Sequence, residues 1–263
     1  MPNRPRVSGC EGVILRRRNL GEADTIFTVY SPSEGKFDAI AKGVRKARSR
    51  MRGHLEPLSR SRLLLAKGRT LDVFTQAETI EPYRRVREDL GRGAAAIYCA
   101  ELIDRFTEDS APHPEVYGLL LDTLDGLEAG GPGWLARWFE LHLLAMLGFE
   151  VQVEACARCG GRLPERETLF VAGAGGLVCP ECRPEAGAGR LVSVEAVKVM
   201  RFASRAAAGE FARLRLPGGL AAELGAVLGD AVRYHLEAEP RSSRYVDEVG
   251  TLIAETSVPA PPT

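Results

Sequence analysis

The sequence predicts an α+β multidomain protein, in which an N-terminal β-barrel precedes an α-helical bundle that carries an inserted four-cysteine zinc module. Three observations support this prediction. Residues 1–80 show the two-residue apolar alternation that is typical of strands. From residue 81 onward the apolar residues recur at helical spacing. Two C-x2-C pairs lie between predicted helices, and this spacing is typical of a tetrahedral zinc site.

The composition restricts the class of protein. The chain has 263 residues, of which 45% are hydrophobic and 27% are charged, as is ordinary for a globular chain of about two domains. There is no run of eighteen apolar residues, so no membrane span is expected. No apolar signal-peptide core precedes Arg16. Together with cysteine pairs of the metal-binding type, this predicts a cytoplasmic location.

The first domain, residues 1–80, is expected to form a small barrel. Apolar and polar residues alternate at 25–30 and at 36–42, and the turn-forming segment SPSEG at 31–35 separates these two strands. Further short strands are expected at 12–15, 62–65 and 71–77. Five short strands in about eighty residues suit a closed or partly open barrel.

The helical bundle is expected at 81–150 and 191–255. Its predicted helices lie at 86–107, 114–127, 134–147, 193–208, 220–237 and 240–255. Pro114 suits a first helical turn, Gly148 a helix end and Ser193 an N-cap. The proline-rich tail at 256–263 is expected to be disordered.

The inserted module, residues 151–190, contains Cys156, Cys159, Cys179 and Cys182, with nineteen residues between the two pairs. We predict that these four thiolates hold one structural Zn(II), because they complete its coordination and leave no position for water or substrate. A disulfide pair and a redox C-x-x-C are the alternatives. A redox motif normally occurs singly beside a βαβ pattern, which is absent from this sequence.

Charge is distributed unevenly along the chain. Residues 1–80 contain sixteen Lys or Arg and eight Asp or Glu, a net charge of +8, so the remaining residues carry −8. This asymmetry predicts that the first domain alone contacts a polyanion. The candidate residues are Lys36, Lys42, Arg45, Lys46, Arg48, Arg50 and Arg52, with Arg16, Arg17 and Arg18 as a second cluster.

The segment 42–52 is the clearest candidate. In an extended conformation, its residues 46, 48, 50 and 52 would face one side, at a spacing similar to that of phosphates in a stretched single strand. Arginine suits phosphate because its planar fork donates two hydrogen bonds at once. A solvated loop is the alternative for 42–52, and an exposed strand end is the alternative for 16–18.

Aromatic residues give two further predictions. Four of them lie near the basic segment, namely Phe27, Tyr30, Phe37 and Phe74. They would stack on bases if exposed, but we expect at least half to fill the barrel. Trp134 and Trp138 are one helical turn apart, and core packing is the favoured interpretation. The alternative is a hydrophobic groove for a partner peptide beside Arg137.

The sequence shows no catalytic pattern. It contains no GxxxxGK, HExxH or GxSxG motif and no complete GxGxxG. Its four histidines form no ligand-like pair. We therefore predict a protein that is not an enzyme.

Short motifs along the chain give a family resemblance. The first domain contains GVIL at 12–15, GEAD at 21–24, EGK at 34–36, AKGVR at 41–45, Ser49, LEP at 55–57 and QAE at 76–78. The C-terminal part contains RYHL at 233–236 and SSRY at 242–245. With the order of strands, helices, cysteine module and helices, these motifs resemble the RecO family of recombination mediators over most of the chain.

The resemblance implies an OB-fold for the barrel and a non-enzymatic role in recombinational DNA repair. It implies binding of single- and double-stranded DNA, annealing of complementary strands, and work with RecR and, in some settings, RecF. It also implies contact with the single-stranded-DNA-binding protein and help in loading RecA on coated DNA, in the cytoplasm at the nucleoid. The four-cysteine module is not universal in that family, so it is not expected to be essential to the shared activity.

Two other classes stay open at this point. A zinc-ribbon interaction protein would bind RNA or a polymerase through the cysteine module. A metalloenzyme would need an open metal position, which four thiolate ligands do not leave.

Overall fold

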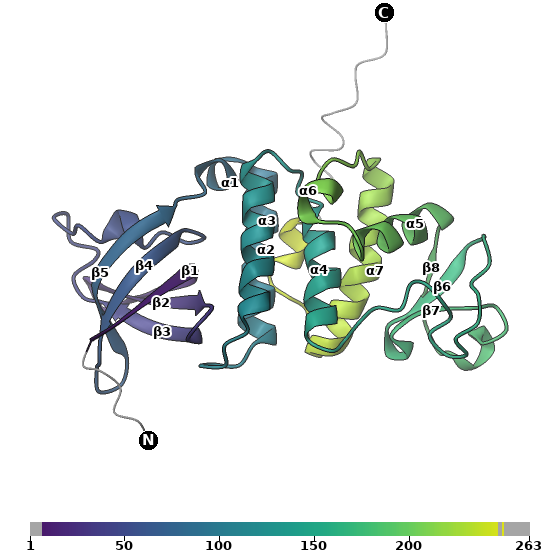
Figure 1. Ribbon diagram of the computed structural model, residues 1–263, viewed down its shortest axis with the longest axis horizontal. Coiled ribbons are helices and arrows are strands. Elements are labelled where there is room, and N and C mark those ends of the chain that lie inside the picture. The colour runs from purple at the N-terminus through teal and green to yellow at the C-terminus, as the bar shows by residue number, and fades with distance from the viewer. Residues whose placement is uncertain (1–6, 247–248, 250–263) are drawn as a thin grey trace, which may run out of the picture.

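The computed structural model describes residues 7–246 and 249. Figure 1 shows three parts in a row: a strand-rich domain at the left, helices in the middle and a small three-stranded sheet at the right. Within the described residues, no helix combines the length and the apolar character that crossing a membrane requires.

Five strands close into a barrel in the order β1-β2-β3-β5-β4. They are β1 (Val7–Leu20), β2 (Asp24–Ser31), β3 (Gly35–Ala41), β4 (Arg60–Ala66) and β5 (Asp72–Glu81), with η1 (Arg52–His54) before β4. β1 closes the barrel because it pairs with β2 along one edge and with β4 along the other. The arrangement is OB-like, and it confirms the predicted five strands. β1 is longer than expected, since it continues through 16–20.

The barrel has its own apolar interior, in which Phe27 and Phe74 meet edge to face with ring centroids 5.9 Å apart. β2 is buried along nearly all of its length. The reason is that Phe27 and Val29 point into the barrel, whereas Tyr30 packs against Tyr117 of the helical part.

The helical part comprises α1 (Arg84–Glu88), α2 (Leu90–Phe106), α3 (Pro114–Glu128), α4 (Leu135–Met146), α5 (Val194–Ala203), α6 (Ala208–Phe211) and α7 (Gly218–Leu236). The single helix predicted at 86–107 is two helices. Asp89 has an extended backbone (ψ 126°) and accepts a hydrogen bond from the Arg92 N–H, so it caps a new helix. The predicted cap at Ser193 is confirmed, because its hydroxyl oxygen accepts from the Ala196 N–H.

Barrel and helices share one hydrophobic cluster. Val13, Leu15, Tyr30, Leu58 and Tyr83 of the barrel side belong to the same buried cluster as the apolar residues of α2, α3 and α4. Polar contacts cross the same boundary. The barrel is therefore packed firmly against the helices.

The cysteine module contains β6 (Thr168–Val171), β7 (Gly176–Val178) and β8 (Arg190–Val192) in the order β7-β6-β8, with η2 (Ala172–Ala174) and η3 (Arg183–Glu185). β8 belongs to this sheet, so the module continues to residue 192 rather than 190. Arg190 forms an ion pair with Asp230 of α7 at 2.8 Å. This pair and the shared apolar cluster attach the module to the helices.

The C-terminal predictions fall partly outside the described residues. Residues 243–246 are helical, in agreement with the start of the helix predicted at 240–255. The predicted tail at 256–263 lies outside the described residues.

Candidate metal centre and nucleic-acid interface

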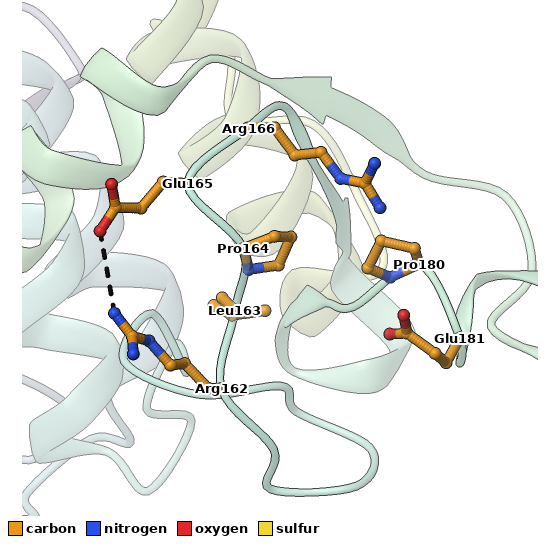
Figure 2. Close-up of a pocket in the computed structure, with 7 residues that line it drawn as sticks. All are labelled: Arg162, Leu163, Pro164, Glu165, Arg166, Pro180 and Glu181. Atoms are coloured by element: carbon orange, nitrogen blue, oxygen red, sulfur yellow. Dashed lines mark ion pairs between the residues drawn. The ribbon is translucent and has the colours of Figure 1, made fainter.

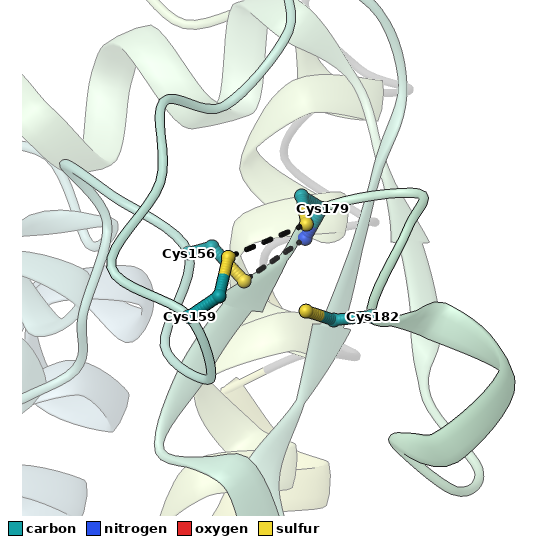
Figure 3. A group of neighbouring side chains, drawn as sticks. All are labelled: Cys156, Cys159, Cys179 and Cys182. Carbon is teal, nitrogen blue, oxygen red and sulfur yellow. Dashed lines mark hydrogen bonds between the residues drawn. The ribbon is translucent and has the colours of Figure 1, made fainter.

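Two tight turns present the four cysteine sulfurs to one point, as Figure 3 shows. In the first turn, the Gly160 N–H donates to the Cys156 carbonyl at 2.9 Å, and Gly160 takes the positive φ of 69° that closes the turn. In the second turn, the Cys182 N–H donates to the Cys179 carbonyl at 3.1 Å. β7 ends at Val178 and so delivers Cys179 directly to the centre.

The geometry of the sulfurs fits a tetrahedral metal ion. All four Sγ atoms lie within 4.8 Å of one another, and those of Cys159 and Cys179 are 3.8 Å apart. Four thiolates around zinc, with Zn–S bonds of about 2.3 Å, form a tetrahedron with edges of about 3.8 Å. The four residues are free thiols, at separations well beyond a disulfide bond of about 2.05 Å. The predicted ligand set is thus brought together, and it is able to bind a metal ion.

Electrostatics also favour a cation at this centre. Burial raises the pKa of Cys156, but backbone N–H groups, first that of Cys179, outweigh burial and lower the pKa to about 6. The Cys182 N–H lowers the pKa of Cys179, but hydrogen bonds with the Glu181 side chain and the neighbouring thiols prevail and raise it to about 12. One thiol therefore ionises at neutral pH while its neighbour does not. A divalent cation would hold all four as thiolates.

A shallow depression of about 280 Å³ lies beside the second cysteine turn (Figure 2). Pro164 and Pro180 form two of its walls, and Arg162 and Glu165 form an ion pair at 3.8 Å at its edge. Its lining contains no nucleophile and no further cysteine or histidine. It therefore adds no chemistry to the metal centre.

Residues 42–52, which we call the basic loop, directly follow β3. They are not extended, as the predicted single-face arrangement required, but fold into successive turns. The Lys46 N–H donates to the Gly43 carbonyl at 3.1 Å, and the Ser49 N–H donates to the Lys46 carbonyl at 3.0 Å. Gly43, with φ of 66°, turns the chain away from the strand direction. The predicted alternation of cations along an extended strand is therefore wrong.

The basic loop nevertheless presents its cations to solvent. All six are exposed, and none forms an ion pair with another described residue: Lys42, Arg45, Lys46, Arg48, Arg50 and Arg52. Val44 and Leu55 are buried in the barrel core on either side of the loop tip. Asp24 Oδ1 also accepts from the Gly43 N–H at 2.7 Å. The loop is thus fixed near its start and its end, while its cations stay exposed and form no ion pair with another described residue.

The β1–β2 turn meets the basic loop at the same end of the barrel. Arg45 contacts the β1–β2 turn, since its guanidinium donates to the Gly21 carbonyl and its N–H to the Ala23 carbonyl, both at 3.0 Å. β3 and β5 are parallel, so the β4–β5 hairpin before β5 lies at the opposite end of this strand pair from the basic loop after β3. That hairpin carries the exposed Lys67 and Arg69. Sequence reasoning omitted these two as site residues, although the basic run extends to residue 69.

Lys36 has a different role from the predicted one. Its side chain is 11% exposed, and its Nζ donates to the carbonyls of Asp104 and Thr107, the latter at 2.7 Å. It also forms an ion pair with Asp109 at 3.4 Å. Carbonyls at the end of α2 have no intrahelical donor, so Lys36 supplies one. Because this contact holds the barrel against α2, the ammonium is not available to a DNA phosphate, which corrects the prediction.

Arg16, Arg17 and Arg18 lie near the end of β1, and each is paired with a carboxylate. Their partners are Asp104 at 2.6 Å, Glu56 at 3.2 Å and Asp38 at 3.0 Å, respectively. All three arginine side chains are at least half exposed. Ion pairs this exposed are weak, so they do not exclude a phosphate. A contact of this cluster with DNA stays a prediction.

The four aromatic candidates are part of the barrel or its border. Phe27, Tyr30 and Phe74 are at most 3% exposed, and Phe37 packs against the barrel interior. The expectation that at least half fill the core is confirmed. Base stacking on the three buried rings is excluded.

Trp134, Arg137 and Trp138 do not form a surface groove. Arg137 and Trp138 are 5% and 4% exposed, and Trp134 is half-buried. The Arg137 guanidinium lies 3.1 Å from the Glu140 carboxylate, and the Trp138 Nε1–H donates to the Ala206 carbonyl. Core packing, the favoured interpretation, is therefore confirmed for Trp138. The partner-groove alternative is wrong at this position, because the helices that follow the module cover the stripe.

An apolar depression bordered by arginine exists instead on α5. It measures about 400 Å³ and is lined in part by Phe202, which is 43% exposed, and by Lys198, Arg201 and Arg205. Glu154 pairs with both arginines. Sequence reasoning missed this surface because Phe202 has the helical spacing that is typical of a buried core residue.

These observations define a class of protein: an OB-like barrel with an exposed basic loop, joined to a helical body that carries a cluster of four cysteines able to bind a metal ion. Two family models match the same two parts. "Recombination protein O N terminal" matches residues 7–83, and "Recombination protein O C terminal" matches residues 87–244. The junction between them falls where β5 ends and α1 begins. The chain therefore belongs to the recombination protein O (RecO) family.

Curated relatives agree over almost the full chain. The DNA repair protein RecO of Roseiflexus sp. (strain RS-1) is 38% identical over 261 residues, which cover 98% of this chain and 90% of that protein. The DNA repair protein RecO of Moorella thermoacetica is 36% identical over 247 residues, which cover 94% of this chain and 92% of that protein. The DNA repair protein RecO of Dehalococcoides mccartyi (strain CBDB1) is 33% identical over 240 residues, which cover 91% of this chain and 94% of that protein.

Proposed function

We propose that the protein is a non-enzymatic, DNA-binding mediator of recombinational DNA repair. The basic loop carries this proposal, because it holds six exposed cations that form no ion pair with another described residue. Surface cations left without carboxylate partners favour a polyanionic ligand. The relatives are named DNA repair proteins, which supports DNA as that ligand.

The proposed binding is electrostatic and tolerant of sequence. Cations of the loop contact phosphates and release counterions, which makes affinity depend steeply on salt. Because Phe27, Tyr30 and Phe74 are buried, stacking on bases contributes little. Phosphates are common to single and double strands, so both are bound. Further cations at Lys67 and Arg69 reduce the repulsion between two strands and promote their annealing.

The proposed partners follow from membership of the family. The protein works with RecR, and in some settings RecF, to load RecA on single-stranded DNA coated by the single-stranded-DNA-binding protein. An acidic, apolar-ended tail of the coating protein needs an apolar groove beside an arginine. The depression at Phe202, Arg201 and Arg205 meets this requirement and replaces the stripe at Trp134 and Trp138 as the candidate.

The metal in this proposal is one structural Zn(II), bound by Cys156, Cys159, Cys179 and Cys182. Four thiolates leave no open coordination position, so zinc supplies stability to the module and no reaction chemistry. The proposed location is the cytoplasm, at the nucleoid, where thiols stay reduced.

A fluorescence titration with single-stranded DNA tests the proposal. We expect the full-length protein to bind oligonucleotides of different sequence with similar affinity, and log affinity to fall linearly with log salt. Affinity that is independent of salt, or restricted to one sequence, would contradict the proposal.

A second candidate function is a zinc-ribbon protein that binds RNA or a polymerase. The exposed Arg158, Arg162 and Arg166 beside the metal centre are the observation that favours it. Competition between single-stranded DNA and structured RNA for the full-length protein separates the two. Preference for RNA that is lost on metal removal would support this candidate.

A further inference from the structure

Aromatic side chains from α2, from α7 and from the segment directly after α4 meet at one end of the helical part. Phe106 of α2 lies 6.4 Å, centroid to centroid, from Phe149, which follows α4. Phe149 stacks on His235 of α7 at 4.3 Å with the rings inclined by 22°. Tyr234 meets His235 edge to face at 5.2 Å. We call this surface, together with Met146, the aromatic end.

The aromatic end is exposed. Met146, Phe149 and Tyr234 are 42%, 40% and 54% exposed. Burial lowers the pKa of His235, so this ring is neutral at neutral pH and adds to the apolar surface. Contiguous exposed apolar side chains are unusual on a soluble domain and mark interaction sites.

The backbone fixes Phe149 in this exposed position. Gly148 has φ of 83°, and its N–H donates to the Ala145 carbonyl at 3.1 Å. The Phe149 N–H donates to the Leu144 carbonyl at 2.7 Å. These two bonds form a Schellman motif that ends α4. Phe149 is therefore held on the outside by an ordered helix end and not by a loose loop.

The electrostatics of this surface are negative. Three helices, α2, α4 and α7, end here, and each C-terminus carries about half a negative charge. Glu150 and Glu237 are exposed next to these ends. Arg105 donates to the Glu239 carbonyl, and Arg233 is paired with Asp230 and Glu239, so both arginines are already engaged.

We propose that the aromatic end is a docking surface for a protein partner that presents lysine or arginine among apolar side chains. Apolar residues of the partner would cover Met146 and Phe149. Its cations would lie over the aromatic faces and near the helix C-termini, where both interactions favour positive charge. Nucleic acid is the wrong ligand here, because its phosphates would be repelled. The charge of the aromatic end is thus opposite to that of the basic loop at the barrel end.

The cysteine module helps to shape this surface. An added Cβ at Gly173, in η2, would lie 3.4 Å from the Tyr234 ring, so η2 packs directly beside that ring. η2 connects β6 to β7, and β7 leads into Cys179. Metal binding therefore supports one border of the aromatic end.

Binding of two designed peptides to the full-length protein tests the proposal. One is an amphipathic helix of about fourteen residues built from leucine and lysine, and the other has glutamate in place of lysine. We expect the lysine peptide alone to bind. The double variant F149S/Y234S, which keeps every charge, should bind it at least tenfold more weakly. L191S, at an apolar residue that is 52% exposed elsewhere, is the matched control and should leave binding unchanged.

Four results would overturn the proposal. They are equal binding by wild type and F149S/Y234S, equal binding of the two peptides, loss of single-stranded DNA binding in F149S/Y234S, and a wild-type dimer that the double variant converts to monomer. The last would assign the surface to a second copy of this chain. A further drop in lysine-peptide affinity in E150Q/E237Q, with unchanged thermal unfolding, would support the charge contribution.

Discussion

The barrel and the metal module are both small β structures, but different forces hold them together. The barrel strands have seven to fourteen residues, close on themselves and enclose eleven buried apolar side chains of their own. The module strands have three or four residues, and their buried side chains belong to the cluster of the helices. The barrel thus has its own core, whereas the module shares the core of the helices and, on our proposal, also depends on a metal ion.

This difference separates function from stability. In the barrel, the proposed DNA contacts lie on loops outside the core. Substitution of these charged side chains should therefore not unfold the barrel. In the module, the four cysteines are needed for folding, because strands of three or four residues cannot be stable alone. The two regions should therefore respond in opposite ways to substitution.

Metal removal is the strongest test of this contrast. Chelation, or Cys179→Ser, should destabilise the module by several kcal/mol, because structural zinc contributes folding free energy directly. Limited proteolysis should then cut within 151–192, while single-stranded DNA affinity stays within about twofold, since the proposed DNA contacts lie on the barrel. Cys10→Ser, at a thiol outside the centre, is the control. Loss of DNA binding with an intact barrel would show that the module takes part in binding.

Replacing the loop cations should have the next largest effect. R48A/R50A/R52A should reduce the slope of log affinity against log salt by about 2 for single-stranded DNA, at about 0.7 per phosphate contact. Thermal unfolding should not change, because the three side chains are exposed. R16A/R17A/R18A removes the same charge from arginines that are paired with carboxylates, so we expect a smaller change of slope. An equal change of slope in both variants would show that the cations of the basic loop and those of β1 contribute equally to DNA binding.

Lys36 tests the boundary of the barrel. K36M keeps the length of the side chain but leaves the Asp104 and Thr107 carbonyls without their donor, which should lower the free energy of unfolding by about 1–3 kcal/mol. K42M, at an exposed lysine, should leave stability unchanged. Denaturant unfolding measures both. If K36M were as stable as wild type and bound DNA more weakly, Lys36 would be a DNA contact after all.

The smallest effect concerns Glu101, which holds the C-terminal segment on α2. Burial opposes ionisation of this carboxyl, but hydrogen bonds from the Ser242 hydroxyl and the Arg241 and Ser242 N–H groups lower its pKa below the usual 4.5. The stabilisation is therefore present above about pH 4.5 and is lost as pH falls through the lowered pKa. E101Q should cost about 1 kcal/mol or less at pH 7, because the site is partly exposed. Unfolding free energies of variant and wild type should converge as pH falls through the lowered pKa of Glu101, and a constant difference would contradict this origin.

Sequence patterns predicted the parts of the fold that depend on local spacing. The alternation at 25–30 and 36–42 became β2 and β3, and the C-x2-C spacing brought four sulfurs within 4.8 Å. Gly148 ended its helix as expected, because a left-handed residue is needed there. The break at Asp89 was missed, although an aspartate before a helical run is an N-cap signal.

Sequence patterns failed where tertiary contacts decide the role of a charged side chain. Lys36, Arg48 and Arg137 are all cations in basic or apolar stretches, yet one caps α2, one is free in solvent and one is buried beside Glu140. Their environments depend on residues up to 88 positions away, which no local period reports. The alternation assumed for 42–52 failed because Gly43 turns the chain.

The core that barrel and helices share has a consequence for the DNA itself. Tyr30, Leu58 and Tyr83 pack into the same cluster as α2 and α3, so the barrel cannot pivot without exposing apolar surface. A strand bound at the basic loop, as proposed, would thus be kept at a fixed distance and angle from a protein bound at the aromatic end. If both proposals hold, the molecule is a rigid spacer between two ligands of opposite charge.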